Sequence, residues 1–306
     1  MSRPPYASLP EAVQQWVGEV LASPVVGSSS ESGGFSPGVA ARVACSSGRR
    51  AFVKAVSGLV NPDSPDLHRR EARVAGGLPA SVGSPALLGS YDDGTWVALV
   101  FEEVDGRPPA QPWVRSELDA VLRLLDRLAV ELTPSPLDVG QLVDERAFAW
   151  TGWQMLAASD VPLSPVEAAH LDQLVTLERS WASAALGETL LHNDVRADNV
   201  LITPAGDAVL VDWPWARRGA AAVDVVMFAP TVELGGGPPA EEVVRACAVG
   251  RAAAPEAVDA MVAAYTGLMQ HRMRQPPPPG IPTVREFQAR QGQVGLRWLA
   301  ERLAWG

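Results

Sequence analysis

One stretch, Thr189 to Trp215, limits the possible folds of this chain more than any other. It contains two short apolar runs, Val200–Thr203 and Ala208–Val211, and a turn-forming segment, residues 204–207 (Pro-Ala-Gly-Asp), separates them. Aliphatic and β-branched runs on either side of a Pro/Gly/Asp loop predict a β-hairpin. The rest of the chain must therefore build around an antiparallel pair of strands near its middle.

The expected pairing of this hairpin brings two oxygen-bearing side chains together. If Thr203 pairs with Ala208, Asn199 lies opposite Asp212, and directly opposed residues have Cα atoms about 4.5–5.5 Å apart. Oxygen ligands of this kind suit a hard cation such as Mg²⁺, which is commonly held by a few protein groups together with substrate phosphates. The open end of the hairpin is therefore a candidate site for such a cation, with Asp194 on the loop just before it.

The polar residues before the hairpin follow a recognisable spacing. His192, Asp194 and Asn199 form an H-x-D-x4-N pattern, and Asp212 follows thirteen residues after Asn199. This order resembles the catalytic and metal-binding loops of the protein-kinase-like superfamily. Trp213 stands where protein kinases have Phe-Gly, and no Ala-Pro-Glu segment follows. The sequence is therefore most similar to the aminoglycoside phosphotransferase family of small-molecule kinases.

The resemblance implies a role for each residue of this loop. Asp194 would accept the proton of the substrate hydroxyl, and His192 would support the loop. Asn199 and Asp212 would hold Mg²⁺. Arg196 takes the place of a lysine that protein kinases carry two residues after the base, which implies contact with the γ-phosphate. The alternative interpretation is that His192 is a core histidine and Asp194 an ordinary turn residue.

A glycine-rich turn upstream is a candidate phosphate-binding loop. The segment Ser28–Gly38 contains Gly34, Phe35 and Ser36, and an alternating run at Val39–Ala44 follows it. Glycine lets backbone N–H groups approach phosphate oxygens without a Cβ in the way. By the resemblance, these three residues would bind the nucleotide phosphates, and a plain linker is the alternative.

One lysine interrupts the apolar alternation of the next predicted strand, Arg50–Val56. Lys54 is followed seventeen residues later by Glu71, within a helix predicted over 67–76. A buried lysine needs a carboxylate partner to stay charged, and in the kinase-like fold such a lysine holds the α- and β-phosphates. Lys54 and Glu71 look like this pair. The alternatives are an edge-strand charge for Lys54 and a surface ion pair with neighbouring arginines for Glu71.

The strand predicted over Trp96–Phe101 ends in a short polar crossing that contains Gly-x-Pro at residues 106–108. This resembles the hinge between kinase lobes, where the adenine ring would hydrogen-bond the C=O of Glu102 and the N–H of Val104. The hinge predicts an N-terminal nucleotide-binding lobe over residues 1–103. A catalytic and substrate-binding lobe would follow over residues 104–306.

The fold class expected from these elements is α+β, with a bilobal protein-kinase-like fold. The small N-terminal lobe would hold an antiparallel β-sheet and one key helix, and the larger C-terminal lobe would be mostly helical. Apolar periodicity places helices at 8–21, 118–132, 140–158, 164–186, 219–228, 239–252, 255–273 and 283–303. Within them, Asp224 is expected to anchor the catalytic loop by hydrogen bonds, as the resemblance implies.

Charge and composition limit the expected partners. The net charge of −10 argues against nucleic acid and anionic membranes. It would suit a cationic substrate, although a solvated acidic surface gives the same value. Two distant cysteines, Cys45 and Cys247, and no apolar run of membrane-spanning length predict a cytoplasmic protein with reduced thiols. A monomer or a homodimer is expected.

The function implied by the resemblance is ATP-dependent O-phosphotransfer to an alcohol group of a small molecule, with ATP rather than GTP as donor and Mg²⁺ as cofactor. The acceptor is left open among an aminoglycoside or other antibiotic, an amino sugar and a related metabolite. The acidic candidates for its pocket are Glu233, Glu241, Glu242 and Glu286. A nucleotide-binding pseudokinase that acts as a regulatory module is the alternative, but the candidate lysine, base and metal ligands are all present. A protein kinase would need activation-segment features that the sequence lacks.

Overall fold

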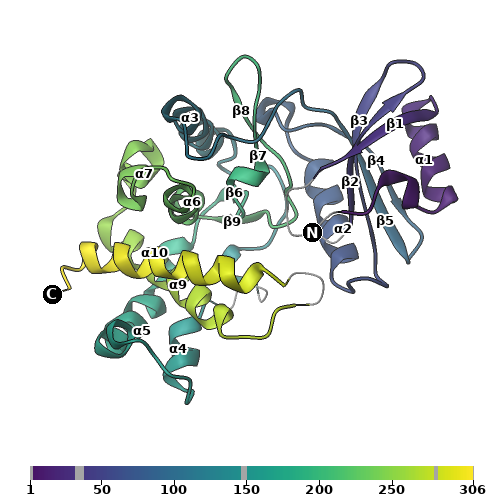
Figure 1. Ribbon diagram of the computed structural model, residues 1–306. Helices are drawn as coiled ribbons and strands as arrows, with labels where there is room; N and C mark the ends of the chain where they lie inside the picture. The colour runs from purple at the N-terminus through teal and green to yellow at the C-terminus, as the bar shows by residue number, and fades with distance from the viewer. Residues whose placement is uncertain (1–2, 32–37, 146–149, 279–281, 306) are drawn as a thin grey trace.

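The chain forms a five-stranded antiparallel sheet near its N-terminus and a mostly helical part after it (Figure 1). The computed structural model describes residues 3–31, 38–145, 150–278 and 282–305. The sheet has the order β1-β2-β3-β5-β4. Its strands are β1 Val25–Ser30, β2 Val39–Cys45, β3 Arg50–Ser57, β4 Leu87–Asp92 and β5 Trp96–Glu102. The predicted α+β, kinase-like fold class is confirmed.

The two faces of this sheet pack against different helices, because successive side chains of a strand point to opposite faces. Ala51, Val53 and Ala55 of β3 share a hydrophobic cluster with the buried side of α1 (Glu11–Leu21). Lys54 lies on the other face and reaches α2 (Ser64–Ala75). The sheet therefore separates an apolar layer under α1 from a second face, toward α2, on which Lys54 lies among apolar side chains such as Phe52 and Phe101.

Both N-terminal helices begin at residues other than the predicted ones. The helix predicted from residue 8 begins at Glu11, because Ser8 ends a separate 3-10 turn and Pro10 occupies the N-cap. The helix predicted from residue 67 begins at Ser64. Its first N–H groups are capped from outside, since Asn61 Oδ1 accepts hydrogen bonds from the backbone N–H of residue 63 at 2.9 Å and of Ser64 at 3.2 Å.

The helical part of the chain is built around α9 (Pro255–Met273), which packs against α4, α5, α6 and α10. The described helices of this part are α3 Arg115–Glu131, α4 Gly152–Ala157, α5 Pro165–Ala185, α6 Ala222–Leu234, α7 Ala240–Ala246, α8 Ala248–Ala252, α9 and α10 Val284–Arg302. They share one hydrophobic cluster, which Val74 and Val82 of the preceding region also join. The predicted division of the chain at residue 103 stays a prediction.

The single helix predicted over 140–158 is wrong. Its described residues form only a 3-10 turn, Leu142–Asp144, and the short α4. The reason is tertiary pairing, because the chain at residues 139–140 runs beside β9 (Arg217–Gly219). Arg218 donates its backbone N–H to Gly140 O at 3.0 Å and its Nε to Val139 O at 2.9 Å.

Two small sheets hold the central stretch, β6 (Thr189–Leu191) with β9 and β7 (Val200–Ile202) with β8 (Ala208–Leu210). The β7–β8 hairpin forms as predicted, but its predicted register is wrong by one residue. Ile202, and not Thr203, pairs with Ala208.

The turn explains the register of the β7–β8 hairpin. Thr203 N–H donates to Asp207 O at 2.9 Å, which leaves a three-residue loop that ends at Gly206 with φ +86°. Loops of this length commonly end in a left-handed glycine. As a result Asn199 O accepts from Val211 N–H at 3.0 Å, and Asn199 lies opposite Val211.

Among the described residues, no helix is both long enough and apolar enough to span a membrane.

Candidate active site

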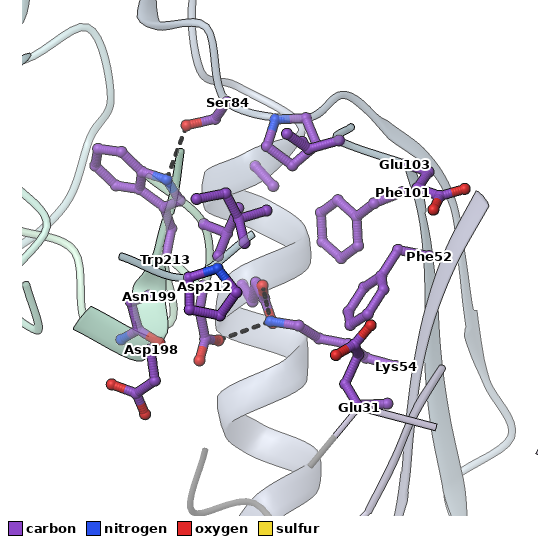
Figure 2. A pocket seen from close by; sticks show the side chains of 18 of the residues that line it. Glu31, Phe52, Lys54, Ser84, Phe101, Glu103, Asp198, Asn199, Asp212 and Trp213 are labelled. Atoms are coloured by element: carbon purple, nitrogen blue, oxygen red, sulfur yellow. Dashed lines mark hydrogen bonds and ion pairs between the residues drawn. The ribbon is translucent and has the colours of Figure 1, made fainter. Parts of the chain in front are cut away.

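A cavity of about 470 Å³ lies between the five-stranded sheet and the β7–β8 hairpin (Figure 2). It is called the nucleotide cavity below. Its apolar wall includes Phe52 and Phe101, and its polar end includes Asp198, Asn199 and Asp212. The predicted nucleotide-binding residues among the described part of the chain all line it, namely Lys54, Glu71, Glu102 and Val104. The other three, Gly34, Phe35 and Ser36, lie outside the described residues.

Lys54 is held between two carboxylates at the polar end of this cavity. Its Nζ lies 2.6 Å from Glu71 Oε1 and 2.8 Å from Asp212 Oδ1. The Lys54 side chain is 15% exposed and that of Glu71 is 4% exposed. The predicted pairing of Lys54 with Glu71 is confirmed. The edge-strand alternative is wrong because β3 lies between β2 and β5.

These charges shift one another's pKa values. Burial alone would lower the pKa of Lys54, but the charges of Asp212 and Glu71 raise it overall. Burial alone would raise the pKa of Asp212, yet Lys54 lowers it to about 2. Both groups therefore stay ionised at neutral pH, and a charged carboxylate faces the cavity.

Arg42, which sequence reasoning missed, fixes the crossing that follows β5. Its Nε donates to Glu31 Oε1 at 2.6 Å and one terminal nitrogen donates to Glu103 Oε1 at 2.7 Å. The same nitrogen donates to Val104 O at 3.1 Å. The available signal was alternation, since Arg42 pairs with Phe52 across β2 and β3 and so lies on the cavity face of the sheet.

The loop after β6 is held by a partly buried carboxylate and a histidine. Asp224 of α6 accepts the backbone N–H of His192 at 2.8 Å and of Asn193 at 2.7 Å. This confirms the predicted anchoring by Asp224. Asp194 N–H lies 3.3 Å from His192 Nδ1, and His192 Nε2 lies 2.9 Å from Val211 O.

These contacts fix the tautomer of His192. Because Nδ1 accepts a hydrogen bond, Nε2 must carry the proton that it donates to the carbonyl. Burial lowers the pKa of this histidine to about 4, so the ring is neutral at ordinary pH. His192 thus connects the start of the loop to the end of β8, which is the geometry expected of a supporting residue.

Asp194 lies at the centre of the loop with its carboxylate held from two sides. Arg196 donates to Asp194 Oδ1 at 3.1 Å, and Asn199 Nδ2 donates to Asp194 Oδ2 at 3.1 Å. The Asp194 side chain is 24% exposed. Burial raises its pKa to about 7 although Arg196 opposes that shift. Arg196 also donates two hydrogen bonds to Asp198, from Nε to Oδ1 and from a terminal nitrogen to Oδ2, both at 3.0 Å.

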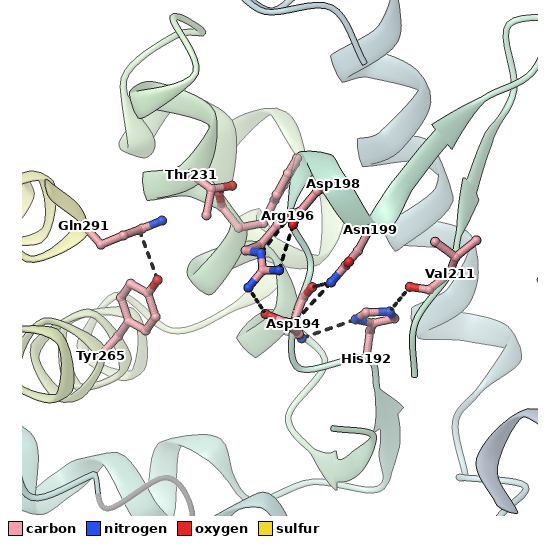
Figure 3. A network of polar contacts seen from close by, with 10 residues as sticks. His192, Asp194, Arg196, Asp198, Asn199, Val211, Thr231, Tyr265 and Gln291 are labelled. Atoms are coloured by element: carbon pink, nitrogen blue, oxygen red, sulfur yellow. Dashed lines mark hydrogen bonds and ion pairs between the residues drawn. The ribbon is translucent and has the colours of Figure 1, made fainter. Parts of the chain in front are cut away.

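A second cavity of about 470 Å³ lies on the other side of this loop, and it is called the acceptor cavity below. It is lined by Asp194 and Arg196 and by residues of α6, α9 and the first turns of α10. Figure 3 shows Asp194 between His192 on one side and Tyr265 of α9 on the other. Asn199 lines the nucleotide cavity and contacts Asp194, which lines the acceptor cavity, so this contact lies between the two cavities.

The acidic residues expected near the acceptor do not line this cavity, whose described lining includes none of Glu233, Glu241, Glu242 and Glu286. Two of them are occupied elsewhere by arginines of α10. Glu233 pairs with Arg297 at 2.8 Å, and Glu241 pairs with Arg302 at 2.7 Å. Sequence position near the C-terminus was therefore a poor guide to the lining.

Comparison with known proteins identifies relatives of this arrangement. The chain matches the model of the phosphotransferase enzyme family over residues 32–287. No curated protein sequence matches it.

Solved structures with the same fold include kinases of small molecules. A thermostable mutant of aminoglycoside phosphotransferase APH(4)-Ia, in a ternary complex with AMP-PNP and hygromycin B, matches with a TM-score of 0.63 and 16% identity. This match covers 97% of this chain and 100% of that chain. LicA in complex with AMP matches with a TM-score of 0.62, 11% identity and coverage of 95% and 98%. LicA is a choline kinase from Streptococcus pneumoniae. At these identities the likeness shows a shared fold.

Proposed function

Because this chain belongs to the phosphotransferase enzyme family, we propose that it is a kinase that transfers the γ-phosphate of ATP to a hydroxyl group of a small molecule. The observation that carries the proposal is the junction of the two cavities. Lys54 and Asp212 line one cavity, Asp194 lines the other, and Asn199 contacts Asp194 between them. A phosphoryl donor and an acceptor bound in these cavities would meet beside Asp194.

The nucleotide cavity suits a base at one end and phosphates at the other. The adenine ring lies against Phe52 and Phe101 and hydrogen-bonds the backbone of Glu102 and Val104. Lys54, oriented by Glu71, binds the α- and β-phosphates. The apolar and polar ends of the cavity support this orientation. Gly34, Phe35 and Ser36 remain the proposed cover of the phosphates.

The polar end of this cavity fits a magnesium ion. Lys54 contacts Oδ1 of Asp212, which leaves the second carboxylate oxygen. Asn199 directs its Nδ2 to Asp194, which leaves its Oδ1 as an oxygen ligand. One carboxylate and one neutral oxygen, completed by phosphates and water, is a typical set for Mg²⁺. When bound, Mg²⁺ supplies positive charge beside the β- and γ-phosphate oxygens.

Asp194 orients the attacking hydroxyl and accepts its proton. Its raised pKa, about 7, lies near ordinary operating pH, which favours a group that must hold and release a proton. Arg196 keeps this carboxylate in place and is the proposed contact of the γ-phosphate. His192 and Asp224 fix the loop backbone and so act as positioning residues.

The test is ADP release over a panel of hydroxyl compounds, measured beside Mg·ATP affinity for the wild type and for Asp194→Asn. Turnover that depends on an acceptor and falls in the variant, with nucleotide affinity unchanged, supports the proposal. Mg·ATP binding without turnover on any acceptor would instead favour a nucleotide-binding regulatory module.

A further inference from the structure

The acceptor cavity carries an excess of positive charge. Among its described lining residues are three guanidinium groups, Arg196, Arg272 and Arg285, and one carboxylate, Asp194. This is the opposite of what the net charge of −10 would suggest. The sign of the charge at the cavity is therefore a local property that the total does not convey.

The three arginines are not balanced in the same way. Arg196 pairs with Asp194 and with Asp198, so its charge is matched within the loop. Arg285, in the first turn of α10, donates instead to neutral oxygens, namely Pro276 O at 2.7 Å and Gln288 Oε1 at 2.7 Å. These contacts hold the guanidinium in position without cancelling its charge.

The pKa values of Arg272 and His271 reflect the positive charge around this cavity. Burial lowers the pKa of Arg272, and the charge of Arg285 lowers it further. The pKa of His271 is also lowered, first by burial and then by Arg272, Arg285 and Arg274. The cavity also receives the N-terminal end of α10, because Val284 and Arg285 line it. The positive end of a helix dipole favours an anion there.

The rest of the cavity wall is largely apolar or aromatic. It includes Trp215, Met227, Leu268, Met269, Val284 and Phe287. Four uncharged polar side chains also line it, those of Asn193, Thr231, Tyr265 and Gln288. Asn193 is 2% exposed, and neither its Oδ1 nor its Nδ2 has a hydrogen-bond partner among the described residues. A buried amide without a partner is costly, and Asn193 is one of the residues at the border of the cavity.

From this combination we propose that the acceptor is an anionic alcohol with an apolar or aromatic body. Its hydroxyl lies at Asp194, its apolar part lies against the wall from α6, α9 and α10, and its carboxylate or similar anionic group pairs with Arg272 and Arg285. This inference rests on the proposed function for the transfer step, whereas the choice of ligand class rests on the cavity itself. It excludes a polycationic acceptor, because Arg272 and Arg285 would repel such a molecule.

The test uses matched compounds that differ only in the charge at one end. Hydroxymethyl-aryl carboxylates with one or two rings are compared with the corresponding amines and primary amides. Equilibrium binding is measured by calorimetry with and without Mg·AMP-PNP, and ADP release is measured separately. The carboxylates are expected to bind about 10–100-fold more tightly than the amines, as for a hydrogen-bonded charge pair.

The matched variants are Arg285→Gln, Arg272→Gln and, as a control, Arg290→Gln on the exposed side of α10. Each of the first two is expected to weaken carboxylate binding about 10-fold and to leave amide binding unchanged. The control variant is expected to bind all compounds as the wild type does. In kinetics the two cavity variants should raise KM for the carboxylates and leave kcat nearly unchanged.

The outcomes separate this inference from the proposed function. Carboxylate binding that depends on Arg272 and Arg285 but gives no ADP release keeps the inference and overturns the kinase proposal. Amines or amides that bind as tightly as the carboxylates overturn the inference, even if ADP is released. Failure of all three compound classes to bind at their solubility limits also overturns it.

Discussion

The two cavities on either side of the Asp194–Asn199 segment differ in how their charges are balanced. In the nucleotide cavity, Lys54 is held by Glu71 and Asp212. In the acceptor cavity, Arg272 and Arg285 line a space whose one described lining carboxylate already pairs with Arg196. Both cavities have a volume of about 470 Å³, and both border the same loop.

This difference implies that the charged groups of the two cavities would pair with their ligands in different ways. Lys54 already has carboxylate partners, so nucleotide phosphates must compete with Asp212 for the lysine, and a cation on Asp212 would remove that competition. Arg285 of the acceptor cavity donates to neutral oxygens and would gain a matching charge from the ligand. The nucleotide side therefore depends on exchange of partners, and the acceptor side depends on complementarity.

The largest expected effect is on the nucleotide side. Asp212→Asn removes the carboxylate charge that faces both Lys54 and the proposed cation, and turnover should fall by about 10³-fold, comparable with losing one preorganised electrostatic contact. Steady-state ADP release measures this loss. Asp207→Asn, at the exposed tip of the same hairpin, is the matched control. Equal rates in both variants would remove Asp212 from the proposed metal site.

The next effect falls on the group between the cavities. Asp194→Asn should lower turnover by about 10²-fold or more, because the proposed general base is lost. Mg·ATP affinity should stay within about twofold of the wild type, since the proposed metal ligands remain. A variant that loses nucleotide affinity in parallel with turnover would place Asp194 functionally in the nucleotide cavity, and the comparison between the cavities would break.

A smaller effect concerns stability and pH at the nucleotide side. Burial, followed by the charge of Lys54, lowers the pKa of His68 from 6.5 to about 4. The unfolded chain then takes up a proton first as the pH falls. The stabilisation by neutral His68 is therefore present above pH 6.5 and is lost between pH 6.5 and 4.

In this pH window the unfolding free energy of His68→Gln should depend less on pH than that of the wild type. At pH 5 the wild type should have lost about 2 kcal/mol of unfolding free energy through His68, and the variant should not show this loss. Urea denaturation at several pH values measures this difference. A wild-type protein and a variant with parallel stability profiles between pH 6.5 and 4 would show that His68 does not carry this linkage.

The smallest expected effect is that of Asp224→Asn, which should not favour one cavity over the other. Asp224→Asn replaces one acceptor of the two backbone N–H bonds at His192 and Asn193 by an amide nitrogen. The loop should loosen and kcat should fall about 10-fold, as misplacement of a catalytic group lowers rates, with little change in either KM. A change confined to the KM of one substrate would assign Asp224 to one cavity instead.

Much of the nucleotide side could be predicted from the sequence because its signals are local. The H-x-D-x4-N spacing, the hairpin around residues 204–207 and a lysine inside an apolar strand each depend on residues that are close in the chain. The Lys54–Glu71 pair and the anchoring by Asp224 were predicted from the family resemblance that these signals carry, and both are present in the structure. The predicted roles in catalysis and metal binding remain proposals.

The errors and omissions arose where distant segments meet. The hairpin register depended on Gly206 in a left-handed conformation, which a count of residues does not reveal. The helix predicted over 140–158 failed because residues 139–140 bond to β9. Arg42 was missed because its partners Glu31 and Glu103 lie on other segments.

The sequence by itself determined the fold class, the family resemblance and the identity of the residues around Asp194, because each is encoded in composition, periodicity and short spacings. Only the tertiary structure decided the acceptor cavity. Its lining comes from α6, α9, α10 and the loop after β6, and the packing of these helices sets which arginines and apolar side chains face inward. The sign of its charge follows from that packing, since the carboxylates Glu233 and Glu241 pair with other arginines outside it.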